Sequence, residues 1–185
     1  YEVANSCRFN DGDSPRLHKT PGGAGNRRTF TISLWVKRCA LGDNIYMFDS
    51  RVDGSDNAPL QFDSSDRLYF RTKVGGTSYD FTTNRVFRDC SAWFHICIKY
   101  DNTQGTEGDR VKIYINGIQE TSFATDNYPA QNADTTVNNT TEHAVGSEGG
   151  GASFFDGYIA EFCLIDGSAL APTSFGEFDE DSPTI

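Results

Sequence analysis

The sequence carries little positive charge. Its 16 lysines and arginines stand against 26 aspartates and glutamates, which gives a formal net charge of −10. A surface that binds nucleic acid needs a surplus of Lys and Arg, and an anionic membrane attracts the same residues. No apolar run approaches the ~20 residues that cross a bilayer as a helix. We therefore expect no nucleic-acid partner and no membrane insertion.

Motifs of common enzymes and metal sites are also missing. The sequence has no H-E-x-x-H, G-x-S-x-G or P-loop pattern. Its five cysteines are odd in number and include no C-x-x-C pair, which argues against a zinc knuckle. Cys97 and Cys163 lie inside apolar runs, so we expect them to be buried as small hydrophobic residues. Cys39 and Cys90 lie at strand ends, where a disulfide is one hypothesis.

Aromatic residues and glycines are abundant instead. Aromatics make up 13% of the chain, with 14 Phe and 8 Tyr, and there are 18 Gly but one Met. This composition favours an all-β protein over a helical one. A length of 185 residues fits one domain, residues 1–185. Because the chain begins at Tyr1 rather than Met, we expect it to be a segment of a longer protein.

The strands are predicted by short runs of alternating apolar and polar residues between Gly, Asn and Asp. In residues 29–37 the alternation places Phe30 and Ile32 on one face and Trp35 on the other. Asn116-Gly117 predicts a type I′ hairpin turn, and residues 124–142 lack a period and are expected on the surface. Around ten such strands indicate an antiparallel β-sandwich or jelly roll. Strands are expected at residues 29–37, 44–50, 59–63, 67–72, 77–83, 93–101, 110–115 and 143–147 and within 154–165.

Four segments in a fixed order resemble a known family. They are "FTISLWVKR", "WFHICIKYD", "VKIYINGIQ" and "HAVGS…FFDGYIAEFCLIDGSALAP". The order is similar to that of laminin-G-like, concanavalin A-like jelly-roll domains, in which W-x-H and an apolar strand precede a strand ending in Asn-Gly and a later F-x-G-x-apolar strand. The resemblance extends over nearly the whole chain and implies the same sandwich fold.

A narrower resemblance points to virion proteins. "CRFNDGDSPRLHKTPGGAGNRRTFTISLWVKR", "FRDCSAWFHI" and "FDGYIAEFCLIDGSALAPTSFGEFD" are similar to laminin-G-like modules of tailed phages. This resemblance implies a non-enzymatic structural or adhesive module of a tail fibre, appendage or capsid surface. The implied location is the virion surface, outside the host cell. The implied partners are other virion proteins, copies of the chain itself and host-surface polysaccharide.

A catalytic role has two weak starting points. "GEFDED" places Glu177, Asp179 and Asp181 at alternate positions, as in glycoside hydrolases that use an E-x-D-x-E strand. Its third acid is Asp rather than Glu, and the run lies at the acidic C-terminus, where a solvated segment is the simpler interpretation. His95 would need a nucleophile and an orienting acid within hydrogen-bond reach. We expect it instead to be a half-buried sheet residue bonded to a backbone group. No catalytic residue is predicted, and a glycoside hydrolase ranks last among the functions considered.

Calcium is the one metal that the sequence suggests, and no cofactor is required. Calcium takes 6–8 oxygen ligands, and two loops are rich in carboxylates. Neither loop matches the D-x-[DN]-x-[DN]-G-x₅-E pattern, so polar turns that use Asp for backbone reasons are the alternative. The candidate ligands are Asp49, Asp53 and Asp56 in the first loop and Asp101, Glu107 and Asp109 in the second.

Glycan binding is the sharper hypothesis, either within a virion protein or as a stand-alone lectin-like module. A sugar site needs aromatic faces beside hydrogen-bonding groups. Trp35, Tyr79 and Tyr128 are the candidates, because each lies off the expected core pattern. Trp35 shares its predicted face with Thr31 and Ser33, which fits a lectin-like sheet surface. The alternative is a tryptophan that packs beneath a loop.

The segment 154–170 raises a question about register. Ile159, Phe162 and Leu164 are apolar but do not share one parity. Either both faces of this strand are covered, or a bulge shifts the register. Glu161 has no second acid nearby in the run, so a paired or rim carboxylate is expected rather than a catalytic one.

Overall fold

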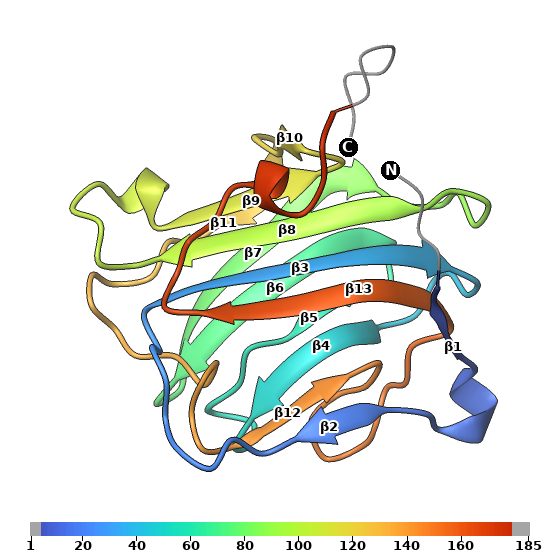
Figure 1. Cartoon of the computed structure of the whole chain (residues 1–185), viewed down its shortest axis with the longest axis horizontal. Helices are drawn as coiled ribbons and strands as arrows, with labels where there is room; N and C mark the ends of the chain where they lie inside the picture. The colour runs from blue at the N-terminus through green and yellow to red at the C-terminus, as the bar shows by residue number, and fades with distance from the viewer. Residues whose placement is uncertain (1–4, 179–185) are drawn as a thin grey trace.

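The computed structural model describes residues 5–178 and forms two antiparallel sheets packed face to face (Figure 1). The expected all-β antiparallel sandwich is therefore confirmed. The six-stranded sheet has the order β1 (Cys7–Phe9), β13 (Gly157–Asp166), β3 (Thr29–Arg38), β8 (Phe94–Asp101), β9 (Val111–Ile115) and β10 (Ile118–Gln119). The seven-stranded sheet has the order β11 (Phe123–Asp126), β7 (Thr77–Val86), β6 (Arg67–Val74), β5 (Leu60–Phe62), β4 (Ile45–Arg51), β12 (Glu142–Val145) and β2 (Leu17–Lys19). Short 3₁₀ turns are η1 (Asp11–Asp13), η2 (Glu107–Asp109) and η3 (Pro172–Ser174).

The core lies between the two sheets and is built by strand alternation. Phe30, Ile32 and Leu34 on β3 are fully buried among apolar residues of both sheets. The Phe30 ring stacks on Tyr100 of β8 with centroids 4.5 Å apart and planes 9° apart. Antiparallel pairing sets these two residues directly opposite each other, so the aromatic pair adds to the area burial.

Strand β13 contains the bulge that its sequence allowed. Its pairing with β3 shifts between Ala160 and Cys163, and Glu161 has a φ of 48°. Two residues of β13, Glu161 and Phe162, thus lie opposite one residue of β3. This pairing, with one residue in the left-handed region, is typical of a β-bulge. The bulge moves Phe162 and Leu164 to the side of the sheet where Ile159 already packs on the core. The parity break in the sequence is thereby resolved.

The hairpin predictions hold, but the chain forms more strands than expected. Asn116 and Gly117 have φ values of 49° and 77° between β9 and β10, as a type I′ turn requires. Strands β1 and β2 were not predicted, and β11 with the start of β12 occupies part of the segment 124–142. These strands have three or four residues, too few for an alternation to mark them.

A buried ion pair ties β3 to the hairpin loop before β6. Arg38 is 0% exposed, and its Nη2 lies 3.0 Å from Asp66 Oδ1 while its Nη1 donates to the Phe87 carbonyl at 2.7 Å. Asp66 also accepts hydrogen bonds from the Gly42 amide and from Arg88. Burial alone raises the pKa of Asp66, but the bonds from Arg88, Gly42 and Arg38 outweigh it and lower the pKa.

The five cysteines are free thiols in the structure, including Cys39 and Cys90, which form no disulfide. Cys97 is buried as expected, whereas Cys163 is half-buried because it follows the bulge.

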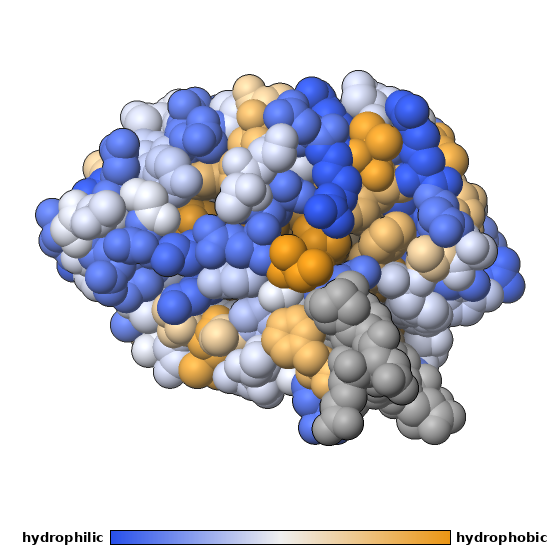
Figure 2. Space-filling view, turned by 90° about the horizontal axis from the view of Figure 1, so that it is seen from above, coloured by the Kyte–Doolittle hydropathy of each residue, from blue (hydrophilic) through white to orange (hydrophobic). Residues whose placement is uncertain are grey.

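Within residues 5–178 no helix is long and apolar enough to cross a membrane. From above the view of Figure 1, apolar residues form separate patches among hydrophilic ones (Figure 2).

Candidate functional site

A polar groove lies on the outer face of the seven-stranded sheet. Its volume is about 490 Å³, and strands β4, β5, β6 and β7 contribute to its floor. Tyr46, Gln61, Tyr69 and Thr82 form one row across these four strands, because each is the antiparallel partner of the next. Four strands at a spacing of about 4.8 Å give the row a length of roughly 14 Å.

Strand alternation explains why these side chains face outward. On β6, Leu68 and Phe70 are buried in the core, so Tyr69 and Arg71 lie on the opposite face. On β4, a register shift between Tyr46 and Phe48 changes the alternation. This local shift puts two successive residues into the core and keeps Tyr46 in the groove.

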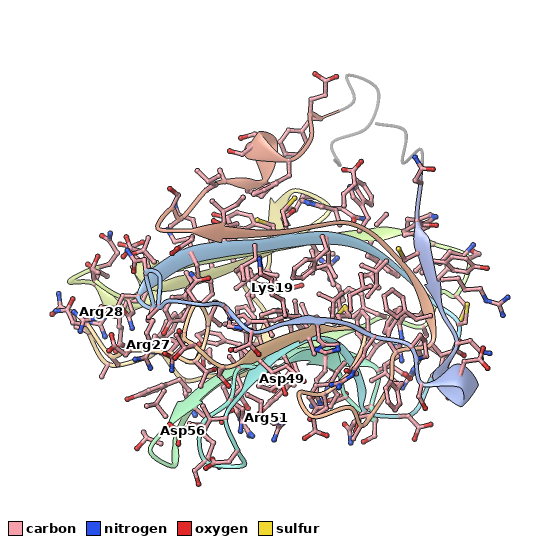
Figure 3. The ribbon with its side chains drawn as sticks, turned by 60° about the horizontal axis from the view of Figure 1, so that its bottom comes forward. Lys19, Arg27, Arg28, Asp49, Arg51 and Asp56 are labelled. Atoms are coloured by element: carbon pink, nitrogen blue, oxygen red, sulfur yellow. The ribbon has the colours of Figure 1, made fainter. Side chains whose placement is uncertain are left out.

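One end of the groove is formed by an arginine held between two acids. Arg51 Nε lies 2.8 Å from Asp49 Oδ2, and Arg51 Nη2 lies 2.8 Å from Glu148 Oε1. Asp49 Oδ2 also accepts the Gly149 amide at 3.0 Å. Figure 3 shows Asp49 and Arg51 beside each other on β4. The guanidinium is therefore fixed in place, with its charge already matched.

The two other arginines of the groove are matched in the same way. Arg67 Nε and Nη2 lie 2.9 Å and 2.7 Å from Asp63 Oδ2. Arg71 Nε lies 2.6 Å from Asp80 Oδ1, which also accepts the Tyr69 hydroxyl at 2.6 Å. The Arg71 guanidinium stands 5.2 Å from the centroid of the Tyr69 ring. Burial, followed by the bond to Asp80, raises the pKa of Tyr69, so this hydroxyl stays protonated.

Two buried acceptors in the groove have no donor. Gln61 and Asn57 are 7% and 3% exposed. Within the described residues, Gln61 Oε1 and Asn57 Oδ1 accept no hydrogen bond. Leaving a buried acceptor unsatisfied costs about 1–3 kcal/mol. The groove thus combines aromatic side chains, fixed guanidiniums and the side-chain amides of Gln61 and Asn57 in its lining.

Trp35 does not lie in this groove. It faces away from the core on the six-stranded sheet, where it is 8% exposed. Ser174 and Phe175 line a cavity of about 210 Å³ with it, and the Leu170 amide donates to Thr31 Oγ1 at 2.7 Å on the same face. The segment after β13 therefore lies over Trp35. This arrangement matches the alternative given for Trp35 from the sequence, a tryptophan that packs beneath a loop.

Tyr79 and Tyr128 lie elsewhere again. Tyr79 is the antiparallel partner of buried Thr72, so it points to the core side of β7 rather than into the groove. Tyr128 packs edge-on against Phe81 with centroids 5.1 Å apart. The structure does not bring the three predicted glycan residues, Trp35 among them, into one surface. The share of each in any binding stays a prediction.

The predicted calcium ligands are engaged by donors of the chain. Asp53 accepts the Ser55 and Asp56 amides, Asp56 accepts the Gly75 amide, and Asp49 is bound to Arg51. Asp49 lies within β4 rather than in the loop, and Asp56 lies away from it in the loop that follows (Figure 3). These are the polar turns that were the alternative to calcium.

The second loop is similar. Asp101 accepts hydrogen bonds from Thr103 and Gln104, and Asp109 pairs with Lys112 at 2.8 Å, while Glu107 is exposed. Among residues 5–178 no three His, Cys, Asp or Glu side chains form a group that could hold a metal. Calcium binding by either loop stays a prediction.

His95 lies in the cavity beneath the segment after β13. It is 0% exposed rather than half-buried, and its Nε2 lies 2.9 Å from Ser33 Oγ rather than from a backbone group. Burial lowers the pKa of His95 to about 4, with Glu161 opposing the shift. Within the described residues its Nδ1 has no hydrogen-bond partner, whereas a catalytic histidine needs an acid there. Ser33 and His95 therefore form a buried hydrogen-bonded pair without the third member of a catalytic triad among the described residues.

Among the described residues, the remaining acidic candidates add no second site. Glu177 is exposed, and Asp179 and Asp181 of "GEFDED" lie outside the described residues. Glu161 is exposed at the bulge on the rim of the Trp35 cavity. The groove residues were missed by the sequence reasoning, although "RLYFR" carries a signal. Tyr69 and Arg71 alternate there with Leu68 and Phe70, which marks them as the outward face of a strand.

A two-layer antiparallel sandwich with a polar groove on one outer face is a lectin-like architecture. The sequence model of the concanavalin A-like lectin/glucanases superfamily matches residues 12–173. The chain belongs to this superfamily. No curated protein matches it in sequence.

Solved structures share the fold at low identity. Domain 4 of AbnA, a GH43 extracellular arabinanase from Geobacillus stearothermophilus in complex with arabinotriose, is 24% identical with a TM-score of 0.59 over 80% of this chain and 65% of that one. The CBM40 of the Ruminococcus gnavus IT-sialidase, bound to alpha2,3 sialyllactose, is 14% identical with a TM-score of 0.58 over 87% and 96%. Mouse laminin alpha1 domains LG4-5 are 18% identical with a TM-score of 0.60, over 91% of this chain and 46% of that one. These similarities concern the fold.

Proposed function

We propose that the chain is a non-catalytic carbohydrate-binding module and that the groove on the seven-stranded sheet is its binding site. The observation that carries the proposal is the row of Tyr46, Gln61, Tyr69 and Thr82 across four strands, with three fixed guanidiniums in the same groove. Sugars offer apolar ring faces to aromatic side chains and hydroxyls to acceptors and guanidiniums. Both kinds of group line this groove.

A binding role fits the groove better than glycoside hydrolysis does. Hydrolysis needs two carboxyl groups across the scissile bond, one of which carries a proton. Asp63, Asp80 and Glu148 each accept hydrogen bonds from an arginine at 2.6–2.9 Å. An acid that accepts from a guanidinium acts as an ionised carboxylate. The groove acids are therefore suited to fixing the arginines and not to donating a proton.

Solved relatives support the same class of ligand. The arabinanase domain was solved with arabinotriose and the sialidase module with sialyllactose. Their identities of 24% and 14% support the use of this fold for glycans without transferring either ligand to this chain. We also propose a location outside cells, as for the arabinanase, which is extracellular.

The groove is tested by a single substitution with a matched control. A glycan array with the folded domain identifies a bound sugar, and calorimetry then compares Gln61→Leu with wild type. Loss of the hydrogen bonds of Gln61 should weaken binding by roughly 3–10-fold, since one such bond is worth about 0.5–1.5 kcal/mol. Gln119→Leu makes the same change on exposed β10 of the other sheet and should leave affinity unchanged. Equal affinities of all three proteins would remove the groove from the proposal.

We further propose that the module belongs to a virion surface protein, such as a tail fibre, an appendage or a capsid-surface protein. The support is the ordered set of segments that resembles tailed-phage modules. In that setting the module contacts other virion proteins or copies of itself and attaches to host-surface polysaccharide. Electron microscopy of particles that lack the protein tests this assignment. Unchanged particle morphology together with unchanged attachment to host cells would contradict it.

A further inference from the structure

We infer that the groove selects neutral, polyhydroxylated glycans over anionic ones. The inference rests on the proposed function, because it names the class of glycan that the same groove takes. The solved relatives leave this open, since arabinotriose is neutral and sialyllactose carries a carboxylate. The charges of this groove decide between the two classes.

The groove contains three guanidiniums, and each is matched by acid. Asp49 and Glu148 both bind Arg51. Asp63 binds Arg67, and Asp80 binds Arg71. Four carboxylates thus stand against three guanidiniums, with two of the carboxylates (Asp63 and Glu148) in the groove lining and two (Asp49 and Asp80) outside it. The ion-paired cluster of the groove therefore carries one net negative charge. An anionic glycan would have to compete with an existing carboxylate for every arginine.

The surroundings increase this preference. The whole chain has a formal net charge of −10, so the long-range field repels an anionic polymer rather than steering it to the groove. Like charges placed together at an interface cost binding energy and suppress the wrong partner. A neutral glycan meets no such barrier.

The remaining hydrogen-bonding groups favour hydroxyls. The side-chain amides of Gln61 and Asn57 line the groove, and a hydroxyl can both donate to and accept from an amide, whereas an ionised carboxylate can only accept. A hydroxyl can in turn accept from the guanidinium N–H groups that the carboxylates leave open. The ion pairs act as preorganised donors for a neutral ligand, and the row of side chains directs it across the strands from β4 to β7.

Affinity gel electrophoresis tests this selection with defined polymers. The neutral set is dextran, mannan and arabinan, and the anionic set is polygalacturonate, hyaluronate and polysialic acid. Wild-type protein should be retarded by at least one neutral polymer and by no anionic one. Its affinity should change less than about twofold when salt is raised from about 0.05 M to 0.5 M, because no net charge is neutralised on binding.

A charge-shifted groove provides the second arm. Asp63→Asn with Glu148→Gln keeps both side chains similar in shape and changes the net groove charge from one negative to one positive. This variant should gain retardation on an anionic polymer that high salt abolishes. Glu107→Gln with Asp126→Asn changes the total charge equally at exposed positions outside the groove lining and should gain none.

The outcomes separate this inference from the proposed function. Retardation of the wild type by no polymer counts against the carbohydrate-binding function itself, and the selectivity falls with it. Retardation by anionic polymers alone, weakened by salt, overturns the selectivity but keeps the function. Neutral binding by the wild type with no gain in the charge-shifted variant overturns the electrostatic reasoning, provided that thermal melting shows the variant to be folded.

Discussion

Acidification from pH 7 to pH 5 should destabilise the protein through one buried histidine. His95 is 0% exposed beneath the segment after β13, and burial lowers its pKa to about 4. In the unfolded chain the pKa of a histidine is about 6.5. The unfolded state therefore binds the proton more readily than the folded state. The stability contributed by neutral His95 is complete above pH 6.5 and is lost as the pH falls toward 4.

The size of the effect follows from the two pKa values. Linkage between protonation and folding gives a loss of about 2 kcal/mol from this residue between pH 7 and pH 5. This is a large share of the 5–15 kcal/mol (roughly) that stabilises a typical domain. The coulombic effect of Glu161, which raises the pKa of His95, is included in the pKa of about 4.

Urea denaturation at both pH values measures the effect, with His95→Gln as the comparison. Glutamine retains a polar group toward Ser33 Oγ, which lies 2.9 Å from His95 Nε2, but it does not titrate. Between pH 7 and pH 5, the free energy of unfolding of the wild type should fall by about 2 kcal/mol more than that of the variant. His143 has a pKa lowered by burial as well, and its contribution cancels because both proteins keep it. Equal losses in the two proteins would refute the reasoning.

Two further predictions concern the ion pair in the core and the calcium loops. Arg38→Met should lower the free energy of unfolding by about 3–5 kcal/mol in urea denaturation, because it leaves the buried carboxylate of Asp66 short of a partner. The double variant Arg38→Met with Asp66→Asn should recover part of that loss. No recovery would contradict the pairing. Removal of calcium with EDTA should leave the melting temperature unchanged, because donors of the chain already bind Asp53 and Asp56 in the first loop and Asp101 and Asp109 in the second. A calcium-dependent rise in melting temperature would show that one of the loops binds the ion.

The elements that the sequence predicts well are those whose signal is local. The alternation of Phe30, Ile32 and Leu34 is an intrinsic feature of a strand with one buried face. Asn116-Gly117 encodes its own turn through positive φ values. Even the bulge at Glu161 left a local trace, because the apolar residues on either side of it differ in parity. No knowledge of the partner strand was needed for these three.

The short strands could not be predicted, since pairing rather than sequence defines them. Strand β1 is three residues long and forms by pairing with the bulged strand β13, Cys7 opposite Ile159. Strand β2 is also three residues long and fully exposed, and it pairs with β12. A run of three residues cannot display a period of two above chance. Their existence depends on a sheet edge built by residues more than a hundred positions away.

The sequence did not point to the groove, because alternation gives two polar faces and does not say which one stays open. Trp35 on β3 and Tyr69 on β6 have the same pattern in the sequence, each flanked by buried apolar neighbours. The difference is made by residues 168–175, which lie over the first face through Thr31 and the Trp35 cavity. Tyr69 faces a groove of about 490 Å³ instead. The covering segment lies far along the chain from Trp35, so only the tertiary structure shows it.

The two outer faces of the sandwich should therefore differ in what a substitution affects, stability on one face and binding on the other. On the six-stranded sheet, the polar and aromatic residues Ser33, Trp35 and His95 are enclosed and contact one another in the cavity that the covering segment lines. On the seven-stranded sheet, Arg51 and Arg71 are fixed by carboxylates but remain at the surface of an open groove. A substitution on the first face should therefore change unfolding before it changes affinity. A substitution on the second face should change affinity first, and this difference is what allows the groove to be tested without loss of the fold.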